Sequence, residues 1–173
     1  MFYAGWQCYN SQTTKIRALE PYSVSQDKME ARAKQRTVHF PEEYSMSWSV
    51  LIVDDEPLTQ DLLRLMLEPA GFRVTGAEHG LEALEKIKEN KPDIVILDVM
   101  MPHMDGITVC KKVRSNPETA DLPIVMLSGK THLNAIEEGL QAGANRYLPK
   151  PMSRADLIQN LNEVLAETAA IRQ

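Results

Sequence analysis

The sequence predicts an α/β fold: a doubly wound (βα)5, three-layer sandwich in which helices cover both faces of one parallel five-stranded sheet. Two observations support this prediction. From residue 49 onward, short apolar runs that are typical of buried strands alternate with stretches of helical periodicity. The connections between them are short, and parallel strands joined by right-handed crossovers of this kind most often take the order 2-1-3-4-5.

Each strand of this sheet is expected to lead into a helix. The strands are predicted at residues 49–53, 72–77, 93–97, 122–127 and 145–148. The first helix follows Glu56 and ends near Gly71, and the others are predicted at residues 81–90, 106–114, 132–142 and 153–168. Apolar residues at helical spacing are expected to face the core: Leu58, Leu62, Leu65 and Met66 in the first helix, Leu81, Leu84 and Ile87 in the second, and Leu157, Leu161, Val164 and Leu165 in the last.

The first 48 residues differ in composition from the rest of the chain. They contain eight of the ten aromatic residues but only four Ile, Leu or Val, and they show no sustained periodicity. Such a segment cannot easily bury a core, so we expect a disordered leader, with an arm that binds a partner as the alternative. The composition changes at Met46, which suggests a third interpretation, that residues 1–45 are an upstream extension absent from the native protein.

Residues 49–168 are expected to form a single domain, followed by a short C-terminal tail at residues 169–173. The regular pattern leaves no room for a separate output domain after it, so a stand-alone domain is predicted. The net charge is −5, and residues 49–173 hold nineteen acidic against thirteen basic residues, which argues against direct binding of nucleic acid.

Cysteine content and hydropathy exclude other classes of protein. Cys8 and Cys110 cannot form a disulfide framework, and no Cys or His spacing suggests a zinc site. No apolar run approaches the roughly 20 residues needed to cross a bilayer, and the N-terminus lacks the features of a signal peptide. We therefore expect a cytoplasmic protein without membrane insertion.

Two of the predicted strands end abruptly in acidic residues. The run Val50–Val53 is followed by Asp54-Asp55-Glu56, and the run Ile94–Leu97 is followed by Asp98. In the predicted strand order these ends are neighbours at the point where the winding reverses, which is where ligands bind in such sheets. Each close pair of carboxylates costs on the order of 4 kcal/mol at an effective dielectric near 20, and Mg²⁺ would remove that cost.

A simpler interpretation is that Asp55 and Glu56 cap the helix that begins at Pro57. Capping does not explain Asp98, which precedes no regular helix. The next two strand ends add a hydroxyl at Ser128 and a cation at Lys150. Taken alone, Ser128 is typical of a turn and Lys150 of a solvated surface, but together the four strand ends would supply acid, acid, hydroxyl and cation to one pocket.

Residues 49–168 resemble the receiver domain of two-component response regulators, which has a flavodoxin-like fold. The segments that carry the resemblance are Val53-Asp54-Asp55-Glu56-Pro57, Leu97-Asp98 through Asp105-Gly106, Leu127-Ser128-Gly129 and Lys150-Pro151. The resemblance implies that Asp98 is the phosphoacceptor and takes a phosphoryl group from a sensor histidine kinase or a histidine phosphotransfer protein.

The same resemblance assigns roles to the residues around Asp98. Asp55 and Asp98 would ligate Mg²⁺ directly, Asp54 would act through bound water, and the backbone carbonyl of Met100 would be a further ligand. Lys150 would contact the acyl phosphate and Ser128 would bond a phosphoryl oxygen. The resemblance also implies a cis peptide bond at Lys150-Pro151 and hydrolysis of the acyl phosphate in the same site.

The resemblance further implies a conformational switch. Ser128 would move toward the phosphoryl group, and Tyr147 would turn inward to fill the space that it leaves, although Tyr147 could equally be a half-buried strand aromatic with a hydrated hydroxyl. The output surface would comprise the helix at 132–142, the strand at 145–148 and the helix at 153–168. It would bind a downstream protein target or a second copy of the chain.

Two other classes of function are compatible with the fold. One is a pseudo-receiver, an adaptor that uses this fold as an interaction module independent of phosphorylation. The other is a Mg²⁺-dependent phosphatase with a nucleophilic Asp, but such enzymes place a second acid two residues after the nucleophile, where this chain has Met100. We expect a protein that catalyses its own phosphorylation and dephosphorylation and is not a turnover enzyme.

Overall fold

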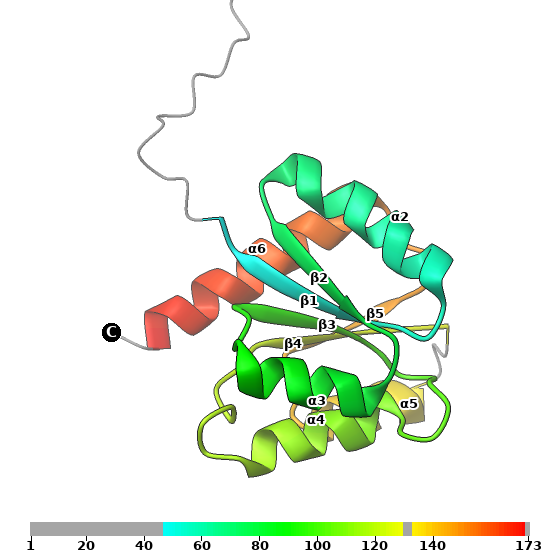
Figure 1. Cartoon of the computed structure of the whole chain (residues 1–173), viewed down its shortest axis with the longest axis vertical. Coiled ribbons are helices and arrows are strands. Elements are labelled where there is room, and N and C mark those ends of the chain that lie inside the picture. The colour runs from blue at the N-terminus through cyan, green and yellow to red at the C-terminus, as the bar shows by residue number, and fades with distance from the viewer. Residues whose placement is uncertain (1–46, 130–132, 172–173) are drawn as a thin grey trace, which may run out of the picture. The chain divides into compact units, whose positions relative to one another are not determined.

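A computed structural model describes residues 47–129 and 133–171, and within them five parallel strands form one sheet in the order β2-β1-β3-β4-β5 (Figure 1). The predicted strand order is confirmed, and the strand bounds agree with the prediction to within two residues. The strands are β1 (Ser49–Val53), β2 (Arg73–Ala77), β3 (Ile94–Asp98), β4 (Ile124–Ser128) and β5 (Arg146–Pro149).

Helices cover both faces of the sheet, as the doubly wound arrangement requires (Figure 1). The helices α2 and α6 lie on one face, and α3, α4 and α5 lie on the other. Their bounds are α2 (Pro57–Leu67), which continues as the 3-10 turn η2 (Glu68–Ala70), α3 (Gly80–Glu89), α4 (Gly106–Ser115), α5 (Leu133–Gln141) and α6 (Arg154–Ile171). The three-layer α/β sandwich is therefore confirmed.

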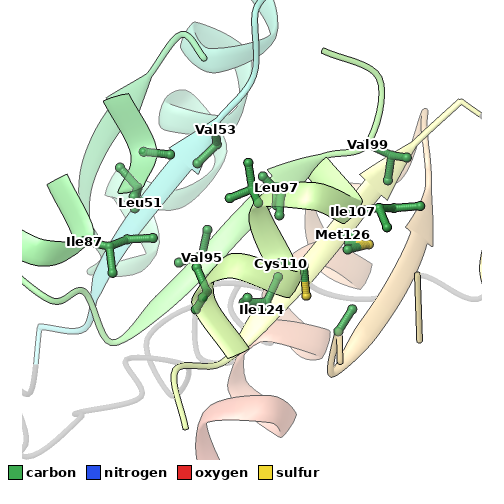
Figure 2. Packing of buried hydrophobic residues seen from close by; sticks show 14 of the residues in the cluster. Leu51, Val53, Ile87, Val95, Leu97, Val99, Ile107, Cys110, Ile124 and Met126 are labelled. Carbon is green, nitrogen blue, oxygen red and sulfur yellow. The ribbon is translucent and has the colours of Figure 1, made fainter. Parts of the chain in front are cut away.

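The central strands are buried on both faces, which explains why their sequences are continuously apolar and do not alternate. Alternate residues of each strand point to opposite sides of the sheet and build two hydrophobic clusters. Figure 2 shows part of one cluster, in which Leu51, Val53, Val95 and Leu97 of β1 and β3 lie close to Ile87 of α3 and Cys110 of α4. The sheet is thus held between two packed layers.

The predicted inward face of α2 was wrong for three of its four residues, while the fourth, Met66, is partly buried and packs against the core. The side chains of Leu58, Leu62 and Leu65 are 75%, 51% and 71% exposed, whereas Leu63 and Leu67 are buried in the core. Leucines occupy most sides of this helix, so their spacing does not select one face.

Two polar residues of α2 indicate what sets its orientation. Gln60 and Arg64 are one turn apart, and their side chains donate hydrogen bonds to backbone carbonyls of Ala77 and Val74, at 3.1 and 2.9 Å. These two hydrogen bonds turn Leu63 and Leu67 toward the sheet and leave the remaining leucines of α2 exposed to solvent.

The predicted inward face of α3 was partly wrong. Leu81 is 59% exposed, Leu84 is only partly buried, and Ile87 is buried as predicted. Where α3 packs against α4, the space allows only a small residue. A Cβ at Gly80 would lie 2.6 Å from Val109 Cγ2. Ala83, also buried, therefore takes the core position that the pattern assigned to its larger neighbours.

The last helix confirms its predicted inward residues, since Leu157, Leu161, Val164 and Leu165 are all buried. It continues to Ile171, so residues 169–171, predicted as part of a C-terminal tail, are helical. The predictions about residues 1–46 and the start of α5 at residue 132 lie outside the described residues. Within the described ranges, no helix has the length and apolar character needed to span a membrane.

Two adjacent leucines of α2 test this orientation. We predict that Leu63→Ala lowers the free energy of unfolding by about 2–4 kcal/mol, because it opens a cavity in the core. Leu62→Ala should change it by less than about 0.5 kcal/mol, because that side chain is half exposed. Urea unfolding of both variants measures the difference, and equal losses would contradict the observed face of the helix.

Candidate functional site

The carboxyl ends of four strands bring the predicted site residues to one edge of the sheet. Asp98 and Ser128 are the last residues of β3 and β4, while Asp54 and Lys150 directly follow β1 and β5. The strands pair in register, Val53 beside Leu97 and Ser128 beside Pro149. This in-register pairing is why residues nearly 100 positions apart in the chain meet.

Lys150 joins the two buried aspartates. Its Nζ donates hydrogen bonds to Asp54 Oδ2 and to Asp98 Oδ1, each at 2.6 Å. The carboxylate side chains are only 3% and 6% exposed, and the lysine side chain is 27% exposed. One ammonium therefore balances one of two buried negative charges, and the trio keeps a net charge of −1.

The environment of Lys150 keeps it protonated. Burial lowers its pKa and is the largest single influence, but the hydrogen bonds and charges of Asp54 and Asp98 together outweigh it and raise the pKa above the ordinary value for lysine. Because the folded-state pKa is raised, the stabilisation from this group is present at neutral pH. It is lost only when the pH rises through that raised value.

The remaining oxygen of each carboxylate accepts a backbone hydrogen bond. Asp54 Oδ1 accepts from the N–H of Glu56 at 3.0 Å, and Asp98 Oδ2 accepts from the N–H of Met100 at 2.7 Å. Each acid thus bonds the backbone two residues further along, which fixes its rotamer and the start of the loop that follows it.

Asp55 lies next to Asp54 in the chain, and its side chain is exposed. Within residues 47–129 and 133–171, no three His, Cys, Asp or Glu side chains form a group that could hold a metal ion. The predicted cluster of three carboxylates is thus present only as the pair Asp54–Asp98 joined by Lys150. The donor chemistry still fits a hard divalent cation, because Asp55 brings the net charge of these four side chains to −2 and all the acidic donors are oxygens.

Capping of α2 does not explain the acids after β1. Glu56 occupies the N-cap position, but its side chain makes no hydrogen bond to the helix backbone and accepts instead from Thr59 Oγ1 at 2.6 Å. Pro57 begins the helix, where its missing N–H costs nothing. Asp54 and Asp55 are therefore not required to begin this helix.

The loop after Asp98 is held by a close backbone approach at Gly106. The Gly106 N–H donates to the carbonyl of Val99 at 3.1 Å, and a Cβ at this position would lie 2.1 Å from the Asp98 carbonyl oxygen. Only glycine fits there. Asp105 caps α4 by accepting a hydrogen bond from the Thr108 N–H at 2.7 Å, so the helix and the loop carrying Asp98 are fixed together.

The two predicted switch residues lie on β4 and β5. Ser128 is fully buried, and its backbone carbonyl accepts from the Lys150 N–H at 2.8 Å. Tyr147 is half-buried and packs against α5, where a Cβ at Gly139 would lie 2.7 Å from its ring. The Lys150-Pro151 peptide bond is cis, as predicted.

This fold and this edge of the sheet together define a flavodoxin-like α/β domain with an acidic site at the reversal of strand order. The profile of the response regulator receiver domain matches residues 50–162. The chain belongs to the response regulator receiver domain family.

Known proteins similar to this chain support the assignment. Response regulator MprA of Mycobacterium sp. (strain KMS) is 41% identical over 120 residues, which cover 69% of this chain and 51% of MprA. The chain thus spans about half the length of the curated relatives it matches. A candidate response regulator of Chloroflexus aurantiacus J-10-fl matches with a TM-score of 0.67 at 43% identity, covering 69% of this chain and 98% of that structure. Vibrio cholerae chemotaxis protein CheY4 matches with a TM-score of 0.65 at 35% identity, covering 68% and 98%.

Replacing Lys150 tests the charge balance of the site. We predict that Lys150→Met lowers the free energy of unfolding by about 3 kcal/mol without divalent ions, because two buried carboxylates lose their counter-charge. Asp54→Asn in the same background should recover much of the loss. Urea unfolding provides the measurement.

Lys91→Met serves as the control, since Lys91 pairs with Asp121 at the exposed surface and its replacement should cost less than about 1 kcal/mol. If Lys150→Met and Lys91→Met lost the same free energy of unfolding, Lys150 would not be the counter-charge that the two buried carboxylates require.

Proposed function

We propose that this protein is a signalling switch that is activated when Asp98 accepts a phosphoryl group in a Mg²⁺-dependent reaction. The donor is a sensor histidine kinase or a histidine phosphotransfer protein, and the group is later lost by hydrolysis at the same site. The observation that carries this proposal is the buried Asp98 carboxylate, held with Asp54 by Lys150, in a member of the receiver domain family.

The chemistry follows from the charges of these side chains. An oxygen of Asp98 attacks phosphorus, so an O–P bond forms while the P–N bond to the donor histidine breaks and the imidazole departs. Asp55, Asp98 and the carbonyl of Met100 would hold Mg²⁺, with Asp54 acting through water. When bound, Mg²⁺ would neutralise charge on the phosphoryl oxygens.

Lys150 and Ser128 stabilise the product. The Lys150 ammonium exchanges its bond to the Asp98 carboxylate for one to a phosphoryl oxygen, and the Ser128 hydroxyl donates to another. Water then attacks phosphorus, the O–P bond to Asp98 breaks, and inorganic phosphate leaves. The protein thus returns to its starting state. We class it as a switch and not as a turnover enzyme, because the phosphorylated protein itself is the signal.

Phosphorylation would change the surface formed by α5, β5 and α6. The phosphoryl group adds nearly two negative charges and three acceptor oxygens at the sheet edge. Movement of Ser128 toward it opens space beneath α5, which Tyr147 fills by turning inward. The changed surface binds a downstream protein target or a second copy of the chain. A cytoplasmic location, where ATP supplies the donor kinase, belongs to the same proposal.

The exposed leucines of α2 support a protein donor. Leu58 follows the acidic loop by two residues, and Leu62 and Leu65 continue the same exposed stripe along the helix. An apolar stripe that begins two residues after Asp54-Asp55-Glu56 suits a partner helix presenting its phosphohistidine to Asp98.

We predict that acetyl phosphate with Mg²⁺ produces a shifted band on a Phos-tag gel, and that Asp98→Asn abolishes it because the nucleophile is lost. Asp105→Asn, a change in the same loop that preserves helix capping, should keep the band. Absence of a shifted band in the wild-type protein would instead favour a phosphorylation-independent adaptor.

A second arm of this experiment distinguishes a small-molecule donor, acetyl phosphate, from a protein donor. Leu62→Asp should slow phosphotransfer from a cognate kinase about tenfold or more but leave acetyl phosphate labelling unchanged, because only the protein donor contacts α2. Leu81→Asp is the matched control, because Leu81 is a similarly exposed leucine in α3, on the opposite face of the sheet. Equal effects of the two variants would refute a docking role for α2.

A further inference from the structure

Gln60 connects the ends of two strands beside the acidic site. It lies in the first turn of α2, and its side-chain Nε2 donates hydrogen bonds to the carbonyl of Asp54 at 2.9 Å and to the carbonyl of Ala77 at 3.1 Å. A primary amide has two N–H groups, so both bonds form at once. Asp54 is the residue after β1 and Ala77 is the last residue of β2.

These bonds hold the backbone on both sides of Asp55. The carbonyl of Asp54, which precedes Asp55, bonds the Gln60 side chain, and the carbonyl of Glu56, which follows Asp55, accepts from the Gln60 backbone N–H at 3.2 Å. The N–H of Asp54 donates to the Ala77 carbonyl at 3.1 Å. The bond to the Glu56 carbonyl is a backbone helix bond, whereas the bond to the Asp54 carbonyl comes from the Gln60 side chain. The direction of the exposed Asp55 carboxylate therefore depends on the Asp54–Asp55 peptide group, which the Gln60 side chain contacts.

The other strand ends of the site are held by backbone bonds. Val99 N–H donates to Leu127 O at 3.2 Å, and Lys150 N–H donates to Ser128 O at 2.8 Å. Substitution of a side chain does not remove such bonds. At the end of β1, a side chain donates to the backbone carbonyl of the site residue Asp54 itself, so substitution of that side chain would remove the bond.

Gly76 on β2 leaves the space that Gln60 occupies. A Cβ at Gly76 would lie 2.0 Å from Gln60 Oε1, closer than any real contact. Its φ is not in the left-handed region, so packing against Gln60 and not backbone conformation calls for glycine here. Gly76→Ala would therefore push the Gln60 side chain away while leaving its chemistry intact.

We propose that Gln60 is a positioning residue that orients the Asp54–Asp55 peptide and so sets the Asp55 carboxylate for a divalent cation. This inference rests on the proposed function, because the cation is the one required for phosphorylation of Asp98. Gln60 touches neither the phosphoryl group nor the cation; it acts through the backbone that carries both acids. Residues that orient metal ligands in this way typically change metal affinity about 10–100-fold when replaced.

The test uses the full chain and MgCl₂ alone, with binding followed by the backbone amide NMR signals of residues 54–56 and 98–100. Gln60→Met, which removes the donor at similar length, should weaken Mg²⁺ binding about tenfold. Gln60→Glu should weaken it further, because a carboxylate would face two carbonyl oxygens. Gly76→Ala should match Gln60→Met, and the double variant should be no weaker than either single variant.

Asp61→Asn, an exposed neighbour on the same helix, is the control and should bind Mg²⁺ like the wild type. Acetyl phosphate labelling of Gln60→Met should approach the wild-type rate at saturating Mg²⁺, because the nucleophile is intact. Variants that lose stability but bind Mg²⁺ with wild-type affinity would overturn the proposal, since Gln60 would then be merely structural. If the wild type itself showed no Mg²⁺-dependent shifts at these residues, the proposed function would fail together with this inference. That result differs from equal Mg²⁺ affinity of the wild type and the Gln60 variants, which would overturn this inference alone.

Discussion

The structure depends on one electrostatic constraint: two carboxylates are buried at the same edge of the sheet with one ammonium between them. Asp54 and Asp98 each give one oxygen to Lys150 and the other to a backbone N–H. These donors compensate the cost of removing the two carboxylates from water. These three side chains keep a net charge of −1, and Asp55 brings the net charge of the site to −2. This residual negative charge, held in fixed geometry, suits the site to a divalent cation, which under the proposed function would offset the charge of an incoming phosphoryl group.

The rest of the fold keeps that constraint in place. A sheet packed on both faces sets the relative positions of strands β1, β3, β4 and β5, and so of the residues that follow them. Backbone contact at Gly106 fixes the loop after Asp98, while Gln60 spans β1 and β2 beside the acidic loop. The bonds from α2 to the edge strand turn Leu63 and Leu67 toward the core and leave Leu58, Leu62 and Leu65 exposed. One arrangement thus both supports the acids and leaves an apolar stripe on the surface.

Much of this arrangement could be predicted from sequence because it depends on order along the chain. Apolar runs predict the strands, and the acidic, hydroxyl and basic residues at their ends predict which edge of the sheet these side chains share. The inward face of α2 could not be predicted, since leucines surround the helix and the deciding contacts are polar. Gln60 was missed because its partners are backbone carbonyls of two strands, which no residue pattern marks. The exposure of Asp55 likewise depends on the loop and not on its place in the motif.

The most direct test is a crystal structure of the full chain with Mg²⁺ and beryllofluoride, a stable mimic of a phosphoryl group on a carboxylate. The account predicts beryllofluoride bonded to the Asp98 carboxylate, with Lys150 Nζ moved from that carboxylate to a fluorine and Mg²⁺ bound by Asp55 and Asp98. A structure in which Asp98 carries no such group and Lys150 still bridges Asp54 and Asp98 under saturating conditions would contradict it.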